Sequence, residues 1–328
     1  MQFLCKAAAW AGVKTHHCHK KTAEYKALEG AFQQHMVDHG LSYGTKEEYE
    51  FRYELYAAKD AAINKVNAEE ANFQLGHNKF STWTDAEYKA ILGARRAEPK
   101  NVVELPETNE DSVDWRTKGA VNPIKDQARC GSCWAFSATA AVEGAHFLKT
   151  GELLSLSEQQ VVSCDHTSYG CNGGWQYSAF EYLEKTAQEL EADYPYTSGT
   201  GSTGTCKADA KKEKIFVSSY NNVKADSVAQ LKAAIATAPT SVTIEADKLV
   251  FQMYTYGIMD STSCGTNLDH AVAAVGYGTD EASGKEYYIV RNSWGTSWGD
   301  QGYIKIAAVD GKGICGIQEQ SLYPLAKN

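Results

Sequence analysis

Residues 127–136 read Gln-Ala-Arg-Cys-Gly-Ser-Cys-Trp-Ala-Phe, and this run, which contains Cys130 and Cys133, carries the most information in the chain. Two cysteines at this spacing fit a redox dithiol, half of a zinc site, or a disulfide cysteine beside a nucleophile. A zinc site requires a second such pair or two nearby histidines, and a redox dithiol requires a preceding strand in a βαβ unit. Residues 118–123 do not resemble a strand and no second pair occurs, so the third alternative is favoured.

The sequence around Cys133 also predicts how its thiol is activated. Residues 132–149 have helical character and precede Gly151, a favourable residue at a helix C-terminus. A cysteine that opens a helix gains thiolate character from the helix dipole and the free N–H groups. A thiolate also needs a base, and the base needs an orienting acceptor. His270, just before a predicted strand, and Asn292 are the candidates.

These residues resemble the catalytic set of papain-family cysteine proteases, in which histidine and asparagine follow the nucleophile by roughly 130–150 residues. His270 lies 137 residues after Cys133, and Asn292 lies 159 residues after it, slightly beyond that interval. Residues 292–299 resemble the family's asparagine segment, and residues 171–174 (Cys-Asn-Gly-Gly) resemble its substrate-binding glycine segment. Together these motifs are very specific.

The resemblance implies a cysteine endopeptidase with a role for each residue. Cys133 attacks as a thiolate paired with protonated His270, and Asn292 fixes the imidazole ring. The Gln127 amide and the Cys133 N–H form an oxyanion hole. Trp294 shields the bond between histidine and asparagine from water. The residues implied in substrate binding are Gly131, Gly173, Gly174, Trp175, Gln176, Thr243, Leu268, Asp269, Ala271, Trp294 and Gln320.

The resemblance further implies that the side chain two residues before the scissile bond sets specificity. The walls of its pocket are Trp175, Gln176, Thr243, Leu268 and Ala271, and its floor is Gln320. Apolar walls favour Leu, Val or Phe, because burial stabilises by roughly 25 cal/mol per Å². Gln320 cannot neutralise a guanidinium, so we expect Leu or Phe to exceed Arg at least tenfold in kcat/KM, about 1.4 kcal/mol.

Two residues beside Gln127 depart from the family pattern. Ala128 stands where glycine is usual, so the local backbone is expected to differ. Asp126 stands where asparagine is common, and this change is expected to have no consequence.

The cysteine count is consistent with one reactive thiol. Seven of the nine cysteines lie in the C-terminal 220 residues, and an odd number indicates pairs and one free thiol. Paired cysteines favour an oxidising compartment. The resemblance implies the pairs Cys130–Cys171, Cys164–Cys206 and Cys264–Cys315, which leaves Cys133 free.

Residues 21–70 predict helices, and one helix face resembles the prosegment signature of cathepsin L-like proteases. Its members, at spacings of three or four, are Glu48, Arg52, Tyr56, Lys59, Ile63 and Asn67, with Tyr and Lys as departures. Residues 76–80 resemble a second prosegment motif, but Thr82 replaces its acidic residue. The resemblance implies an intramolecular inhibitor that runs through the cleft against the substrate direction. The precursor is expected to be latent at neutral pH, and the inhibitor is expected to be lost in acid as carboxylates are protonated.

Three segments are expected from these patterns. Residues 1–20 form an atypical leader, because lysines interrupt the apolar core of a signal peptide. Residues 21–108 form the inhibitory propeptide, and residues 109–328 form the mature peptidase, with cleavage in an exposed linker at 94–111. A metal-binding tract at 16–19 (His-His-Cys-His) is the less favoured interpretation of the leader. The expected location is the lysosome, the vacuole or the cell exterior.

Helical signals followed by strand signals predict an α+β protein with two packed halves and a cleft between them. Helices are expected at 132–149, 157–164 and 175–186, and strands at 214–220, 270–277, 287–292 and 302–306. The resemblance implies a papain-like fold with a helical left half and a β-barrel-like right half, preceded by the helical propeptide.

Charge and composition exclude other classes of function. The net charge is −9, and residues 109–328 carry 18 Lys and Arg against 26 Asp and Glu, which would repel nucleic-acid phosphates. No apolar run approaches the roughly 20 residues of a membrane helix. The expected partners are protein and peptide substrates, the chain's own propeptide and cystatin-like inhibitors, and we expect a monomer without cofactor or metal.

Two alternatives remain from the sequence. A catalytically silent papain-fold binding or storage protein usually lacks the nucleophile, the histidine or the glutamine, and all three are present here. An exopeptidase requires an insertion that closes one end of the cleft, and no His-bearing loop of that kind lies between Cys164 and Cys206.

Overall fold

The computed structural model describes residues 23–327. The expected leader at residues 1–20 and the tract at 16–19 therefore lie outside the described residues. Among the described helices, none is long and apolar enough to cross a membrane.

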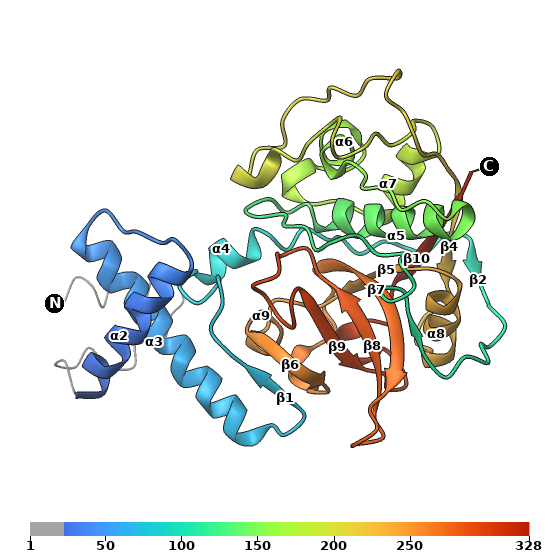
Figure 1. Ribbon diagram of the computed structural model, residues 1–328. Coiled ribbons are helices and arrows are strands. Elements are labelled where there is room, and N and C mark those ends of the chain that lie inside the picture. Colours follow the sequence, from blue (N-terminus) through green and yellow to red (C-terminus); the bar gives the residue numbers. More distant parts are fainter. Residues whose placement is uncertain (1–22, 328) are drawn as a thin grey trace.

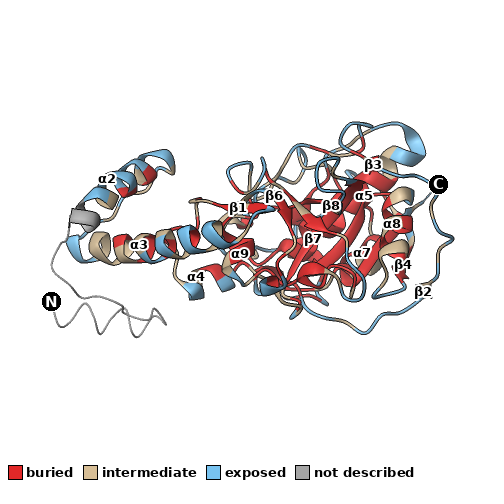
Figure 2. Cartoon of the chain, turned by 90° about the horizontal axis from the view of Figure 1, so that it is seen from below, coloured by how far each residue is buried: buried red, intermediate tan, exposed pale blue. Residues whose placement is uncertain are grey.

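The N-terminal segment begins with two helices, α2 (Ala23–Asp38) and α3 (Lys46–Glu69), as predicted. They pack through Phe32, which is fully buried against Tyr53 and Tyr56. Both helices project from one side of the molecule (Figure 1). Figure 2 shows exposed residues along both of them, whereas buried residues concentrate in the sheet and in α5.

Three helices form one half of the main body: α5 (Cys133–Thr150), α6 (Glu158–Cys164) and α7 (Gln176–Leu183). The three predicted helices are confirmed, with ends that differ by up to three residues. Helix α5 is closed by Gly151, whose φ is +78° and whose N–H donates to Phe147 O at 2.7 Å. Glycine adopts this left-handed conformation without the strain of a Cβ.

The other half is a ten-stranded sheet in the order β1-β6-β9-β8-β7-β5-β10-β4-β2, with β3 paired to β7 outside this order. The strands are β1 (Phe73–Leu75), β2 (Val102–Val103), β3 (Val113–Asp114), β4 (Val217–Val223), β5 (Thr240–Ile244), β6 (Tyr254–Met259), β7 (His270–Thr279), β8 (Glu286–Arg291), β9 (Tyr303–Ala307) and β10 (Ser321–Ala326). Helices α8 (Val228–Thr237) and α9 (Leu249–Gln252) pack against β7 and β6 respectively.

The α+β class with two halves and a papain-like arrangement is confirmed, and the barrel-like half is an open sheet and not a closed barrel. Its two edge strands, β1 and β2, both come from the N-terminal segment. They pair with β6 and β4, so the strands that would have to meet in a closed barrel lie at opposite edges. Strand β7 lies inside the sheet and is buried along all but its last residue, which explains its nearly uninterrupted apolar sequence.

The N-terminal segment crosses the main body between the two halves. Helix α4 (Asp85–Lys89) leads the chain to the start of α5 (Figure 1). Ala94 then forms a parallel bridge with Gly174 and is 8% exposed. Together with β2, this contact docks residues that were expected to form a freely exposed linker at 94–111. The linker expectation is therefore corrected at these two points, because backbone hydrogen bonds to both halves hold the segment.

Candidate active site

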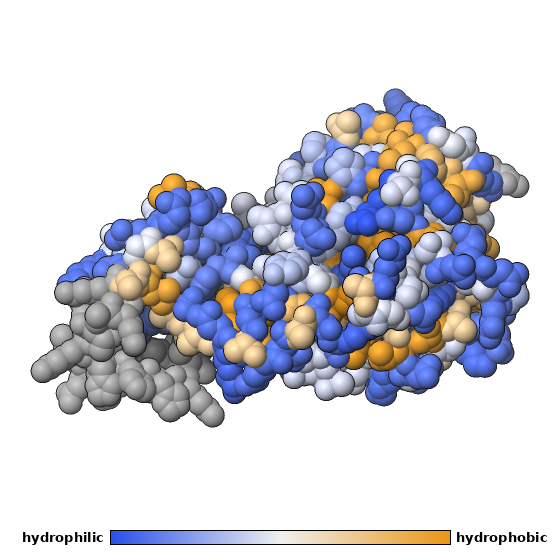
Figure 3. Space-filling view, turned by 60° about the horizontal axis from the view of Figure 1, so that its bottom comes forward, coloured by the Kyte–Doolittle hydropathy of each residue, from blue (hydrophilic) through white to orange (hydrophobic). Residues whose placement is uncertain are grey.

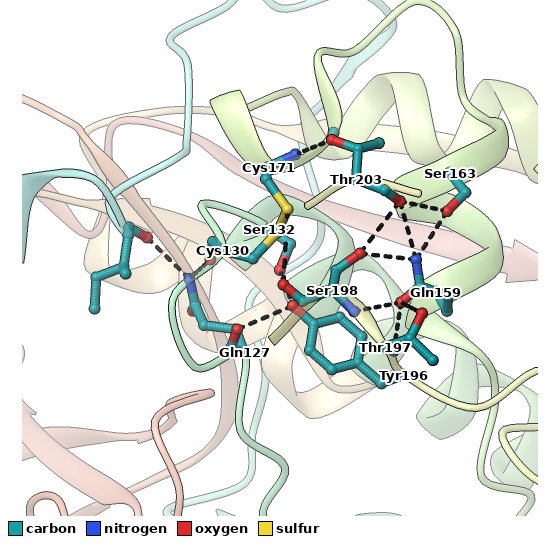
Figure 4. Close-up of a disulfide and its surroundings, with 12 residues drawn as sticks. Gln127, Cys130, Ser132, Gln159, Ser163, Cys171, Tyr196, Thr197, Ser198 and Thr203 are labelled. Atoms are coloured by element: carbon teal, nitrogen blue, oxygen red, sulfur yellow. Dashed lines mark hydrogen bonds between the residues drawn. A yellow bond between two sulfur atoms is a disulfide. The ribbon is translucent and has the colours of Figure 1, made fainter. Parts of the chain in front are cut away.

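Cys133 is the first residue of α5 and is fully buried. Among the described residues it is the one free cysteine. The disulfides are Cys130–Cys171, Cys164–Cys206 and Cys264–Cys315, the pairs that the resemblance implies. The first of them joins the loop before α5 to the glycine segment at 171–174 (Figure 4).

Hydrogen bonds fix α5 against β7, and this contact brings the nucleophile to the histidine strand. One turn after Cys133, the hydroxyl of Ser137 donates to Val272 O at 2.7 Å and lies 2.6 Å from the Ser241 hydroxyl. Ala271, which directly follows His270, packs against Cys133 in a small buried cluster. The start of α5 and the start of β7 therefore meet at the junction of the two halves.

His270 is held by Asn292, one residue beyond the end of β8. Its Nε2 lies 2.8 Å from Asn292 Oδ1, and since that oxygen can only accept, Nε2 carries the proton. Within the described residues, His270 Nδ1 has no hydrogen-bond partner, so its lone pair is free. The Trp294 ring stacks on the imidazole with ring centres 4.5 Å apart and is itself fully buried. This geometry provides an oriented base that is covered from solvent.

Gln127 is held at both ends of its amide. Its Oε1 accepts from the Ser293 hydroxyl at 2.6 Å, and its Nε2 donates to Cys130 O at 2.8 Å and to Ile91 O at 2.9 Å. Its backbone carbonyl accepts from the Tyr196 hydroxyl at 2.9 Å (Figure 4). The amide nitrogen is thus a fixed donor beside the first turn of α5.

The backbone at Ala128, where the family usually has glycine, was expected to differ from the family pattern. Ala128 has a φ of +51°, a left-handed conformation that favours glycine, and its N–H donates to Asp126 Oδ1 at 2.8 Å. The loop therefore keeps a glycine-type backbone and places alanine in it.

The residues expected around the specificity pocket are brought together by β5, β7 and the start of α7. Gln176 Nε2 donates to Thr243 Oγ1 at 2.9 Å, and the Thr243 N–H donates to Gln320 O at 2.9 Å. Thr243 is the register partner of Ala271. Leu268 is 9% exposed and lies near Gly316. Gln176, Thr243, Ala271 and Gln320 are thus linked to one another, whereas Leu268 lies beside Gly316.

The backbone of the N-terminal segment forms hydrogen bonds with residues that are expected to bind substrate. Ala94 N–H donates to Asp269 O at 3.0 Å, and Arg95 N–H donates to Gly174 O at 3.0 Å. Gly174 N–H donates to Gly93 O at 2.8 Å. Further along, Trp175 Nε1 donates to Arg96 O and Ala97 N–H donates to Gln320 Oε1, both at 3.2 Å.

The approach is closest at the two glycines Gly93 and Gly131. A Cβ on Gly93 would lie 1.8 Å from Gly131 O, and a Cβ on Gly173 would lie 2.6 Å from Gly93 O. The segment can therefore pass over the nucleophile loop only because these residues have no side chain.

Comparison with known proteins identifies the family. Residues 109–325 match the family described as papain family cysteine protease, and residues 32–88 match the cathepsin propeptide inhibitor domain (I29). The chain belongs to the papain family of cysteine proteases. It is the precursor of such a protease, with an I29 prosegment ahead of the peptidase.

Individual relatives agree with this assignment. The chain is 42% identical over 334 residues to probable cysteine protease RD21B of Arabidopsis thaliana, covering 96% of this chain and 70% of that protein. Its structure is similar to the recombinant stem bromelain precursor, with a TM-score of 0.82, 36% identity, and coverage of 91% of this chain and 98% of that chain. It is also similar to digestive procathepsin L 3 of Tenebrio molitor larval midgut, with a TM-score of 0.80, 33% identity, and coverage of 90% and 98%.

The prosegment signature acts through polar side chains on one face of α3. Arg52 donates to both carboxylate oxygens of Glu87 at 2.6 and 2.8 Å and to Thr82 O at 2.8 Å. Lys59 Nζ, on a side chain that is largely buried, donates to Phe80 O at 2.6 Å and to Trp83 O at 3.0 Å. These bonds fold the chain after α3 back onto the helix. Phe80 then packs edge-on against Trp294, with ring centres 5.0 Å apart.

Burial in the precursor favours the uncharged forms of Cys133 and His270. Burial raises the pKa of the Cys133 thiol to about 11, against the N–H groups of Ala271 and Gly93. Burial lowers the pKa of His270 to about 4, against its bond with Asn292. Burial also raises the pKa of the Asp269 carboxyl to about 7. At neutral pH the covered site therefore holds a thiol and a neutral imidazole, and an ion pair would require the cover to leave.

Several supporting residues were not predicted from the sequence. Ser293 orients the Gln127 amide, Tyr196 binds its carbonyl, and Ser137 anchors α5 to β7. Ser293 directly follows Asn292, which is a weak signal, whereas nothing in the sequence points to Tyr196. Glu319 was also missed: its side chain is 4% exposed and pairs with both Arg96 and Lys312 at 3.2 Å beside the pocket floor.

Proposed function

We propose that residues 109–328 are the mature endopeptidase, residues 21–108 are its inhibitor, and Gln127, Cys133, His270 and Asn292 are the catalytic residues. The observation that carries this proposal is the bond from His270 Nε2 to Asn292 Oδ1, which leaves Nδ1 free next to the strand residue that packs on Cys133. An oriented imidazole with a free lone pair is what a cysteine nucleophile requires.

The proposed reaction begins once the prosegment has left. His270 Nδ1 takes the Cys133 proton, and the thiolate attacks the carbonyl carbon of the scissile peptide bond. The developing oxyanion is bound by Gln127 Nε2 and the Cys133 N–H, each donor contributing roughly 3 kcal/mol. The imidazolium gives its proton to the departing amine, which leaves an acyl-enzyme thioester. A water molecule, deprotonated by His270, then releases the acid and restores the thiol.

Substitution of the four residues tests the proposal. Cys133→Ala and His270→Ala should abolish hydrolysis of a fluorogenic peptide, whereas Asn292→Ala and Gln127→Ala should leave residual activity. His166→Ala, which removes an exposed histidine, is the matched control and should retain full activity. Turnover by Cys133→Ala at the rate of the unchanged enzyme would overturn the assignment. Labelling of Cys133 by an epoxide-type thiol inhibitor gives a second readout.

We propose a hydrophobic preference in the pocket formed by Trp175, Gln176, Thr243, Leu268, Ala271 and Gln320. Leu268 and Ala271 would offer apolar surface at its wall, and Gln320, whose amide oxygen accepts from Ala97 N–H, supports a neutral floor. Gly131, Gly173, Gly174, Asp269 and Trp294 are the proposed contacts with the substrate backbone and leaving group. Carbonyl and N–H groups of the prosegment form hydrogen bonds with Asp269 and Gly174, which supports the accessibility of these residues to an extended chain.

The remaining proposals concern partners and location. Seven large hydrophobic side chains of residues 23–327 are exposed, on separate elements: Val37, Val102, Leu148, Tyr169, Tyr256, Val309 and Leu325. Hydrophilic side chains cover most of the face in Figure 3, which supports a monomer. Cystatin-like inhibitors are proposed to enter the cleft after the prosegment leaves. Three disulfides support a lysosomal, vacuolar or extracellular location.

A further inference from the structure

A lysine of the prosegment is bound by a carboxylate beside the oxyanion glutamine. Lys79 Nζ lies 2.9 Å from Asp126 Oδ1 and 2.8 Å from Asp126 Oδ2, so the ammonium group contacts both oxygens. The lysine side chain is 19% exposed, whereas the Asp126 side chain is 43% exposed. Burial lowers the pKa of Lys79 and Asp126 opposes this effect. The carboxylate therefore offsets part of the cost of burying the cation.

The position of Asp126 follows from the path of the prosegment. Asp126 directly precedes Gln127 and forms an antiparallel bridge with Trp294. The prosegment passes this point at Lys79 and Phe80 and only later reaches Gly174 and Gln320, at residues 93–97. Under the proposed function, the acyl part of a substrate occupies the side of Gly174 and Gln320. Asp126 then lies on the opposite side of Cys133, where the leaving amine and the residues after it are bound.

Removal of the prosegment takes away the counter-ion of Asp126. Among the described residues, Lys79 is its one ion-pair partner. Lys125 of the peptidase is engaged elsewhere, because it bonds to Glu143 and Glu158 at 3.0 and 2.7 Å in the interior. The guanidinium of Arg129 contacts Trp83 of the prosegment, so it loses this contact when the prosegment leaves.

The carboxylate keeps its place without Lys79. Asp126 Oδ1 also accepts the Ala128 N–H at 2.8 Å, a bond within the peptidase. Loss of Lys79 therefore leaves a partly exposed carboxylate, held by the Ala128 N–H and without its lysine partner, next to the proposed oxyanion donor.

We propose that Asp126 forms a cation-binding subsite that selects lysine or arginine within the first two residues on the leaving-group side of the scissile bond, and that Lys79 occupies this subsite in the precursor. The proposal rests on the proposed function, because it uses the substrate direction assigned there. The expectation from sequence, that aspartate in place of asparagine has no consequence, is thereby replaced.

The expected size of the preference follows from the exposure of the pair. Partly exposed ion pairs shift an equilibrium about two- to fivefold at low ionic strength. Salt screens such pairs, because the Debye length is about 10 Å at 0.1 M and about 3 Å at 1 M. A guanidinium can engage both carboxylate oxygens, so arginine should be selected at least as well as lysine.

Paired peptides test the subsite on enzyme obtained by acid activation of the full chain. Two pairs of internally quenched peptides carry the same residues on the acyl side, with Leu two residues before the scissile bond. The members of a pair differ by arginine or its neutral isostere citrulline, which stands at the first position of the leaving group in one pair and at the second position in the other. The ratio of kcat/KM for arginine over citrulline is measured above pH 5, where an aspartate is charged. Each variant supplies its own citrulline reference, so changes in overall activity cancel.

We expect a ratio of about two to five at one of the two positions, falling towards one in 1 M NaCl. Asp126→Asn should bring the ratio to one, and Asp126→Glu, which keeps the charge, should retain it. Glu281→Gln removes the same charge from the exposed β7–β8 loop and should not change the ratio.

Three results would overturn the proposal: no arginine preference in the unchanged enzyme, a preference that survives in Asp126→Asn, or its loss in Glu281→Gln. The unchanged enzyme with its salt series decides the question even where a variant fails to fold. Absence of cleavage of all four peptides would instead overturn the proposed function, and the subsite with it.

Discussion

The side-chain amide of Gln127 donates a hydrogen bond to the carbonyl oxygen of Ile91 at 2.9 Å. Ile91 lies within residues 21–108, which are proposed as the prosegment, and Gln127 Nε2 is a donor proposed to bind the oxyanion of the substrate. Ser293 holds the other end of the same amide at 2.6 Å, so the donor is oriented before any substrate arrives. Under the proposed function, inhibition and catalysis therefore compete for one N–H group, which is already oriented in the precursor.

The reactivity of Cys133 should report this block. Burial raises the pKa of its thiol to about 11 in the precursor, so at pH 7.5 less than about one thiol in a thousand is ionised. We expect alkylation of Cys133 by iodoacetamide to be at least about 100-fold slower in the full chain than after prosegment removal. The peptide that contains Cys133 is quantified by mass spectrometry. Equal rates in the two forms would show that the prosegment does not control the thiol.

Gly93→Ala should weaken the binding of the prosegment to the peptidase without changing any residue of the peptidase itself. The added Cβ would lie 1.8 Å from Gly131 O, a backbone atom that cannot move aside like a flexible side chain. We expect the precursor to lose latency, with peptide hydrolysis at pH 7 at least about tenfold above the unchanged chain, about 1.4 kcal/mol of docking energy. Gly44→Ala is the matched control, because a Cβ there meets nothing within 4 Å. Full latency in Gly93→Ala would mean that docking does not depend on this approach.

His35 should make the prosegment sensitive to acid. Its ring lies 4.4 Å from that of His39 and 6.1 Å from that of His77, with Tyr56 alongside at 5.1 Å. Burial lowers the pKa of His35 to about 4, and repulsion from the two other histidines acts in the same direction, against attraction by Asp38. Two further charged residues lie near these histidines. Asp60 binds His77, and Lys79 lies near His39.

The sign of this effect follows from proton binding. Unfolded histidine binds its proton near pH 6.5, whereas folded His35 does so near pH 4, so the prosegment loses stability as pH falls through this interval. The slope is at most about 1.4 kcal/mol per pH unit for one proton. His35→Phe removes this slope and should shift loss of hydrogen-exchange protection in α3 to lower pH, measured in a Cys133→Ala background. His166→Phe serves as the control, and an unchanged midpoint in His35→Phe would exclude His35 as a sensor.

The local features of this chain were predictable, and the long-range ones were not. Helix α5 and its Gly151 end follow from short-range rules, and the set of Cys133, His270 and Asn292 follows from motif spacing. The absence of an acidic residue at Thr82 gave no indication of another acid-sensitive group. That group needs His35 and His77 to meet, and residues from separate elements are brought together only by tertiary packing.

The same limit applies to the sheet and to the leaving-group side of the site. Strands β5, β6 and β10 were not predicted, although each is at least as long as the predicted β9, and their places in the sheet join segments that are distant in sequence. The pair of Lys79 and Asp126 spans 47 residues and two segments of different function. Spacing rules describe one helix or strand at a time, so neither could be derived from them.

The last prediction concerns which carboxylate controls arginine in the specificity pocket. Gln320 Oε1 accepts from the prosegment at Ala97, while its neighbour Glu319 pairs with Arg96 on the rim, where the arginine side chain is 66% exposed. Glu319 also pairs with Lys312 of the peptidase at 3.2 Å, so it remains compensated after the prosegment leaves.

We therefore still expect Leu or Phe to exceed Arg at least tenfold, about 1.4 kcal/mol, two residues before the scissile bond. Gln320→Glu should narrow this gap above pH 5, because it adds a carboxylate with no lysine partner. Glu319→Gln is the matched variant and should change the ratio by less than about twofold, because Lys312 already pairs with the Glu319 carboxylate. A panel of dipeptide substrates that vary only this residue gives the ratios. Equal rates for Arg and Leu in the unchanged enzyme, abolished by Glu319→Gln, would place the floor of the pocket at Glu319 and not at Gln320.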